Sequence, residues 1–156
     1  MDFEKRLQDA IVRGERLQAA RQRERADQAI SEDELRTLHS QYRLELSEHI
    51  EQALRKLPDH FPGFRFESLS GDRGWGGSIF RDDVRRGGNS FSRMEAAVRA
   101  FSTAHVLEMT AKGTIANKEI FNRTHYARIP DVDLDAFRQM VDVWILEYAE
   151  RYAAAS

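Results

Sequence analysis

Apolar positions in the first part of the chain recur with the period of an α-helix. Near the N-terminus they follow heptad spacing, at Phe3, Leu7, Ala10, Gly14 and Leu17. The stripe gives way to the polar segment RQRERADQ after Ala20. Ser31 and Glu34 then form a capping box, which is typical of a helix start. We expect one helix over residues 2–29 and a second from Ser31 to just before Pro58. The apolar face of the second helix comprises Leu35, Leu38, Tyr42, Leu46, Ile50, Ala53 and Leu57.

The period changes to two after residue 62, which is the spacing of β-strands. Phe64 and Phe66 alternate with charged residues, and four further strand-like segments follow: GSIFRDDV, RMEAAVRA, HVLEMTAK and EIFNRTHYARI. Polar or glycine-containing turns, among them RRGGNS and GTIANK, separate these segments. Consecutive strands joined by short turns predict an antiparallel meander of about five strands.

A last helical stripe follows Pro130. The acidic start DVDLDAF suits the positive end of a helix dipole. The apolar face that follows predicts a helix packed on one face of the sheet, with Phe137 and Trp144 buried. We therefore predict an α+β fold with two N-terminal helices, the antiparallel sheet and this C-terminal helix. Residues 1–30 form a helical arm and residues 31–156 a single α+β domain. The stripe comprises Leu134, Phe137, Val141, Trp144, Ile145, Tyr148 and Tyr152.

Composition narrows the class of protein. The 156 residues include no Cys, which excludes disulfide and thiolate chemistry. The charged N-terminus lacks the apolar region of a signal peptide, and no apolar run approaches the ~20 residues of a membrane span. We expect a cytoplasmic protein without a membrane partner. The net charge of −2 is unevenly spread: residues 62–128 carry 11 basic and 7 acidic side chains, and residues 129–156 carry 2 and 6.

The stretch LSGDRGWGGSIFRDD concentrates four of the nine glycines in seven residues. Its glycine order differs from that of a dinucleotide fingerprint, and it lacks the lysine of a P-loop. A strand follows instead of a helix, so no helix N-terminus offers free N–H groups to a phosphate. We predict that Gly71–Gly77 joins two antiparallel strands and binds no nucleotide. Two interpretations of Trp75 stay open: a binding-loop residue, or a side chain folded back onto the sheet.

Metal-binding and catalytic motifs are weak. The segment ELSEH differs by one position from an inverted zinc-protease motif, because Glu45 stands where the first His is needed. One His on a helix face gives no imidazole pair for zinc, so we expect a plain i, i+4 pair of Glu45 and His49. No nucleophile elbow is present, and the five histidines lack ligand spacing. We expect neither a metal nor a cofactor.

One sheet face is the best candidate for a site. If the loop before EIFNRTHYARI has an even number of residues, paired positions sum to an odd number. Glu108 then shares a polar face with Phe121, Arg123 and His125, while Tyr126 joins the core side. A His beside a carboxylate can act as a general base, and arginines can hold a carboxylate or phosphate. The alternative is a solvated face with cross-strand ion pairs. The candidate ligand-binding residues are Arg93, Glu95, Arg99, Glu108, Arg123 and His125.

Three functions are compatible with these patterns. The first is a non-catalytic protein-interaction or structural domain that forms a homodimer. The narrow stripe of the first helix must pack on a partner, because a lone helix is marginal in water. The partner is either the second helix, through an antiparallel hairpin turned near Ile30 and Ser31, or a symmetry mate, and we expect residues 1–20 to lie in a homodimer interface. The second is a small-ligand-binding protein or an enzyme that uses the polar sheet face. A pocket lined by Arg93, Glu108 and His125 would favour it, and a flat face would favour the first. A lesser alternative is nucleic-acid binding by the basic middle segment, for which Phe121 is the one expected stacking aromatic.

Overall fold

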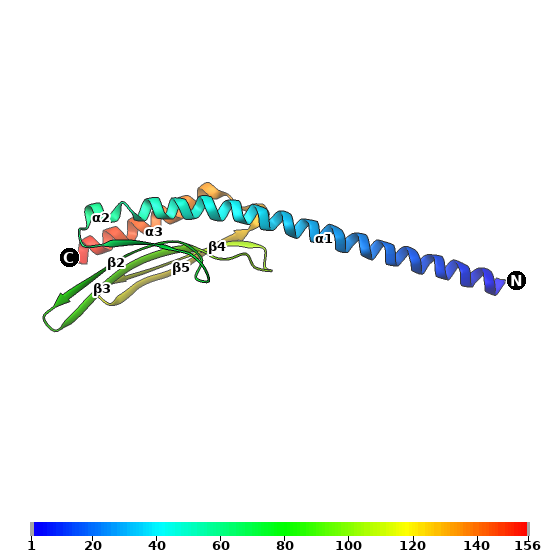
Figure 1. Cartoon of the computed structure of the whole chain (residues 1–156), viewed down its shortest axis with the longest axis horizontal. Helices are drawn as coiled ribbons and strands as arrows, with labels where there is room; N and C mark the ends of the chain where they lie inside the picture. The colour runs from blue at the N-terminus through cyan, green and yellow to red at the C-terminus, as the bar shows by residue number, and fades with distance from the viewer. Residues whose placement is uncertain (1, 156) are drawn as a thin grey trace. The chain divides into compact units, whose positions relative to one another are not determined.

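The computed structural model describes residues 2–155, with the backbone alone described at residues 28–30 and 85. Helices flank the strands in the chain order (Figure 1). This order confirms the α+β fold expected from the sequence. The helices are α1 (Asp2–Leu54), α2 (Leu57–His60) and α3 (Leu134–Ala155), with a 3₁₀ turn at Ile129–Asp131. The strands are β1 (Arg65–Leu69), β2 (Trp75–Arg85), β3 (Gly88–Val98), β4 (Val106–Ile115) and β5 (Lys118–Arg128).

The two N-terminal helices expected from the sequence are joined into one, because α1 continues through Ser31. Ser31 therefore does not act as an N-cap. A capping box marks a helix start only where the preceding helix has ended. No glycine or proline lies between Gly14 and Pro58 to end the helix there. The chain divides into two compact units, Met1–Thr37 and Leu38–Ser156, so the boundary between units falls within α1.

The sheet is an antiparallel meander in the order β1-β2-β3-β4-β5. β2 and β3 pair along their whole length, from Trp75↔Val98 to Arg85↔Gly88. The turn between them is the RRGGNS cluster seen in the sequence. Gly87 lies there with φ of 95°, in the left-handed region that a side chain disfavours.

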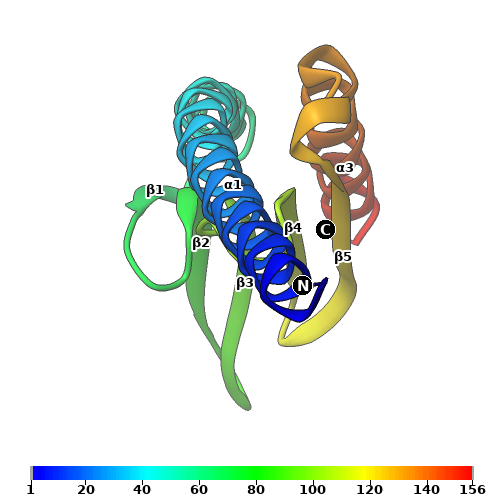
Figure 2. The ribbon, with the colours of Figure 1, turned by 90° about the vertical axis from the view of Figure 1, so that its right-hand side faces the viewer.

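The helices of the second unit cover one face of the sheet (Figure 2). Residues 38–54 of α1 run parallel to α3, as two side-chain contacts between them show. Arg138 of α3 lies 3.6 Å from Glu45, and one turn further along both helices His49 is 2.8 Å from Asp142. Glu45 and His49 thus each engage α3, and the expected pairing of these two residues with one another is wrong.

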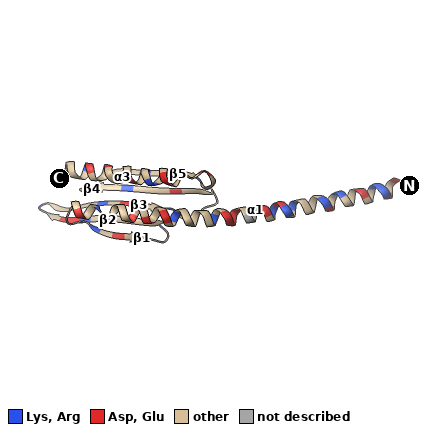
Figure 3. Cartoon of the chain, turned by 90° about the horizontal axis from the view of Figure 1, so that it is seen from above, with Lys and Arg blue, Asp and Glu red and all other residues tan. Residues whose placement is uncertain are grey.

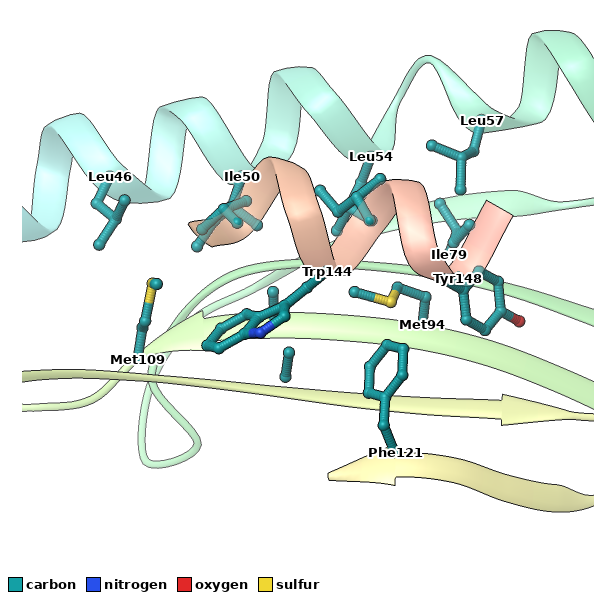
Figure 4. Packing of buried hydrophobic residues seen from close by; sticks show 14 of the residues in the cluster. Leu46, Ile50, Leu54, Leu57, Ile79, Met94, Met109, Phe121, Trp144 and Tyr148 are labelled. Atoms are coloured by element: carbon teal, nitrogen blue, oxygen red, sulfur yellow. The ribbon is translucent and has the colours of Figure 1, made fainter. Parts of the chain in front are cut away.

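The hydrophobic core fills the space between this helix layer and the sheet (Figure 4). Phe137 and Trp144 are 1% and 4% exposed, as the apolar stripe predicted. The one polar group of the fully buried Tyr148 is satisfied, because its hydroxyl donates a 2.9 Å hydrogen bond to the Thr114 carbonyl. Other core residues are Leu46, Ile50, Leu54, Ile79, Met94, Leu107, Met109, Val141 and Ile145.

A buried histidine predicts a pH effect on stability. His39 is 3% exposed and packs edge-on against Phe101. Burial, and then the charge of Arg43, lower the pKa of His39 below its ordinary value of 6.5, against an opposing hydrogen bond with the Arg99 backbone. The unfolded chain therefore binds the proton more readily, and the free energy of unfolding should fall as the pH drops below about 6.5. Urea titrations across this range should show a smaller fall in His39→Gln; equal falls would contradict this assignment.

Candidate functional site

The β4–β5 hairpin decides which side chains share the candidate face. Its turn consists of Ala116 and Asn117, both with positive φ (48° and 70°), as two-residue type I′ turns require. Next to the turn, Ile115 pairs with Lys118. The residue numbers of this pair sum to an odd number. The sequence-based assumption of a loop with an even number of residues is therefore confirmed at this end of the hairpin.

A β-bulge then reverses the faces of β5. The register shifts between Gly113 and Thr114, so that Gly113 pairs with Phe121. Beyond the bulge, paired positions sum to an even number, as in Met109↔His125 and Ala111↔Arg123. An extra residue in one strand turns over every side chain that follows it. The expectation that Phe121, Arg123 and His125 share the polar face with Glu108 is therefore wrong.

Arg123 and His125 instead serve the packing of α3. The Arg123 guanidinium donates a 2.9 Å hydrogen bond to the Glu147 carboxylate on α3. The His125 ring packs edge-on against Phe137, with centroids 4.5 Å apart. By the same reversal Tyr126, expected in the core, is 67% exposed on the opposite face. Neither Arg123 nor His125 belongs to the candidate site.

The other four candidate residues do share the polar face, which lies opposite the helices. The β3–β4 register pairs Arg93 with Thr114 and Glu95 with Lys112, which places Arg93 and Glu95 on the polar side that the sequence predicted for them. Arg93 donates a 2.9 Å hydrogen bond to Glu95 on its own strand. Arg99 lies 3.5 Å from Glu108 across the strand pair. The face therefore carries two ion pairs, one along β3 and one between the residue after β3 and β4.

This face is hollowed. A depression of about 880 Å³ is lined by charged and hydroxyl side chains of β3, β4 and β5, by the segment after β3, and by the β1–β2 turn. A smaller depression of about 170 Å³ adjoins it and includes Arg93. Both are lined by Arg73, Glu95 and Lys112. The polar residues of the larger hollow are Asp72, Arg73, Glu95, Arg99, Ser102, Glu108, Thr110, Lys112, Asn122 and Thr124.

Several of these lining residues were missed from the sequence, for two different reasons. Asn122 and Thr124 lie here because of the bulge. Gly113, a glycine within a strand, is the signal for such a bulge, but it was assigned to the loop. Arg73 comes from the β1–β2 turn, and the sequence pattern does not indicate over which face of the sheet that turn folds.

The glycine-rich stretch forms the turn between β1 and β2, which confirms the hairpin interpretation. Gly71 and Gly74 adopt φ near +100°, and a Cβ on Gly74 would lie 2.5 Å from the Val98 carbonyl oxygen. Trp75 begins β2 opposite Val98, and the Arg43 guanidinium of α1 lies over its ring at 4.0 Å. This cation–π contact places Trp75 on the helix side of the sheet, away from the hollow.

A second candidate feature is an apolar stripe in the first unit. Large apolar side chains are exposed along α1: Phe3 is 66% exposed, Leu7 48% and Leu17 60%. Ala10 and Gly14 continue the stripe between them, and no other atom lies within 4 Å of a Cβ placed on Gly14. Charged residues of both signs alternate with the uncharged ones along this helix (Figure 3). The first unit therefore carries a row of exposed apolar side chains flanked by charge.

The polar sheet face is electrically balanced. It also bears Phe80, Phe91 and Tyr126, where the sequence led us to expect Phe121 alone. Such aromatics suit base stacking, but equal numbers of cations and anions give a phosphate backbone no net attraction. The face carries five basic and five acidic residues. The strand register places four basic and five acidic residues on it, and Arg99, which directly follows β3, is the fifth base: Arg65, Arg93, Lys112 and Arg128 with Arg99, against Glu67, Asp82, Glu95, Glu108 and Glu119.

Comparisons with protein-family models, with curated proteins and with solved structures found no match to this chain. Among the residues that the structure describes, no group of three or more His, Asp or Glu side chains is placed to hold a metal ion. Within the same residues, no helix combines the length and apolarity needed to cross a bilayer. The function must therefore be argued from the two features above.

Proposed function

We propose that this chain is a protein-interaction domain that assembles with a second copy of itself through the apolar stripe of residues 3–17. The observation that carries the proposal is the exposure of Phe3, Leu7 and Leu17 along one side of α1. Isolated helices are marginal in water, and most helical stability in proteins comes from packing an apolar face. A helix that exposes such a row needs a partner to cover it.

The stripe is complementary to itself, which favours a second copy as the partner. Its spacing of four, three, four and three residues is that of the a and d positions of a coiled coil. In an antiparallel pair, Phe3 of one helix can face Gly14 of the other, and Leu7 can face Ala10, with Leu17 at the end of the paired segment beyond these layers. Each layer then places a large side chain against a small residue, and two-fold symmetry repeats both contacts.

Substitutions in the full-length chain test the proposal. Leu7→Asp puts two charges into the interface, one per copy, and should raise the dissociation constant about 100-fold or more, because each buried leucine contributes roughly 1.5–3 kcal/mol. Val12→Asp is the matched control. It introduces the same charge and helix propensity at an exposed apolar residue on the opposite side of the helix.

Sedimentation equilibrium at micromolar concentrations is the measurement. We expect the parent chain and Val12→Asp to be dimers and Leu7→Asp to be a monomer. A monomeric parent chain, or a Leu7→Asp protein as dimeric as Val12→Asp, would show that the stripe is not the interface.

A further inference from the structure

The hollow on the polar sheet face contains two cationic side chains that form no ion pair with any residue whose side chain the structure describes. Lys112 of β4 and Arg73 of the β1–β2 turn line both the larger and the smaller depression. Among the described residues, neither makes a hydrogen bond or an ion pair. One strand and one turn thus bring two available cationic groups to the place where the two depressions adjoin.

The acidic side chains of the hollow are largely neutralised by other residues. Glu95 accepts a hydrogen bond from Arg93, and Glu108 is paired with Arg99. Asp72, the remaining carboxylate of the lining, is exposed and adjoins Arg73 in the turn. The Arg93–Glu95 and Arg99–Glu108 pairs therefore offset the carboxylate charges that would otherwise repel an anion from Lys112 and Arg73.

We propose that this hollow binds a small anion, a molecule carrying a carboxylate or phosphate group whose oxygens lie between Arg73 and Lys112. Arginine presents paired N–H donors that match either group, and the lysine ammonium adds a point charge. Thr110 lines the larger depression and Thr114 the smaller, and each offers a hydroxyl that can donate to an anionic oxygen. The volume of about 880 Å³ is within the range of small-molecule sites.

The balanced charge of the surrounding face favours a small ligand over a polyanion. A nucleic acid would extend beyond the hollow across strands that carry as many acids as bases, whereas a compact anion meets only the locally unpaired cations. This site is on the sheet of the second unit and does not depend on assembly through α1, so failure of either proposal leaves the other standing.

Calorimetric titration of the full-length chain at low ionic strength tests the site, with inorganic phosphate and citrate as separate probes. We expect saturable binding of at least one probe, one molecule per chain. The Lys112→Gln and Arg73→Gln variants should each bind about tenfold more weakly, since each loses one charge-assisted contact. Lys118→Gln is the matched control, because Lys118 is an exposed lysine outside both depressions.

The two probes separate the two sources of the anionic group. Binding of phosphate alone would identify a phosphate-bearing ligand, binding of citrate alone a carboxylate, and binding of both the shared anion site. Absence of saturable binding for both probes would overturn the proposal. So would equal weakening in Lys118→Gln, because that would indicate general charge screening instead of a site.

Discussion

Replacing Trp144 by alanine is expected to lower the free energy of unfolding by about 3–5 kcal/mol, the range for removing a large buried aromatic side chain. The indole points from α3 toward the sheet (Figure 4) and is 4% exposed. It belongs to the core cluster between α1, α3 and the sheet. Its removal leaves a cavity that both helices and the sheet would have to move to fill. Denaturant titration at a fixed protein concentration measures the loss, because the proposed assembly would add to the apparent stability.

Val143→Ala is the control for this experiment. Val143 precedes Trp144 on the same helix but is 55% exposed, so its truncation should change the free energy of unfolding by less than about 1 kcal/mol. A loss below 1 kcal/mol for Trp144→Ala would mean that α3 is peripheral to the core.

The second large effect is expected at Gly76. A Cβ at this position would overlap the carbonyl oxygen of Ala96 and lie 2.9 Å from the Cα of Ala97. Both atoms belong to the backbone of β3, which pairs with β2 and cannot yield without opening the ladder. Gly76→Ala should therefore reduce the free energy of unfolding by about 3 kcal/mol, at the upper end of the usual cost of over-packing.

Gly77→Ala is a control one residue away. Its Cβ would lie 2.9 Å from the Phe66 ring and 3.4 Å from a Leu54 methyl group, and both are side-chain atoms that can shift. The loss should be nearer 1 kcal/mol. Thermal and denaturant unfolding of the two variants should rank Gly76→Ala as the less stable. The reverse order would contradict the close approach of β2 and β3.

Features that depend on local periodicity could be predicted from the sequence. The stripe that includes Phe137 and Trp144 identified both the helix and its buried face, because a helical period holds over many residues. The alternation around Met94, Ala96 and Val98 identified the inward side of β3, and all three residues are buried. The polar residues Arg93 and Glu95 between them were therefore placed correctly on the opposite face.

Features that depend on contacts distant in sequence could not be predicted from local patterns alone. A glycine within a strand signals a bulge, but the register shift in the β4–β5 pair lies where β4, β5 and α3 approach closely. A Cβ on Gly113 would lie 2.9 Å from the Phe121 ring and 3.1 Å from Tyr148 of α3. The prediction of the sheet faces assumed an unbroken alternation of side chains and took no account of such packing. It therefore placed His125 on the wrong face. The error at Ser31 arose from giving one local motif too much weight. Ser31 and Glu34 resemble a capping box, but nothing in the neighbouring sequence ends the helix before Ser31, and α1 continues through it.

We expect the N-terminal part of α1 to be held in its helical form by a second copy, and far-ultraviolet circular dichroism on dilution measures this. The helical signal of the parent chain should fall as the protein is diluted below its dissociation constant. Leu7→Asp should show the lower signal at every concentration, and Val12→Asp should follow the parent chain. A helical signal that is independent of concentration and equal in the parent chain and Leu7→Asp would show that no second copy holds this helix.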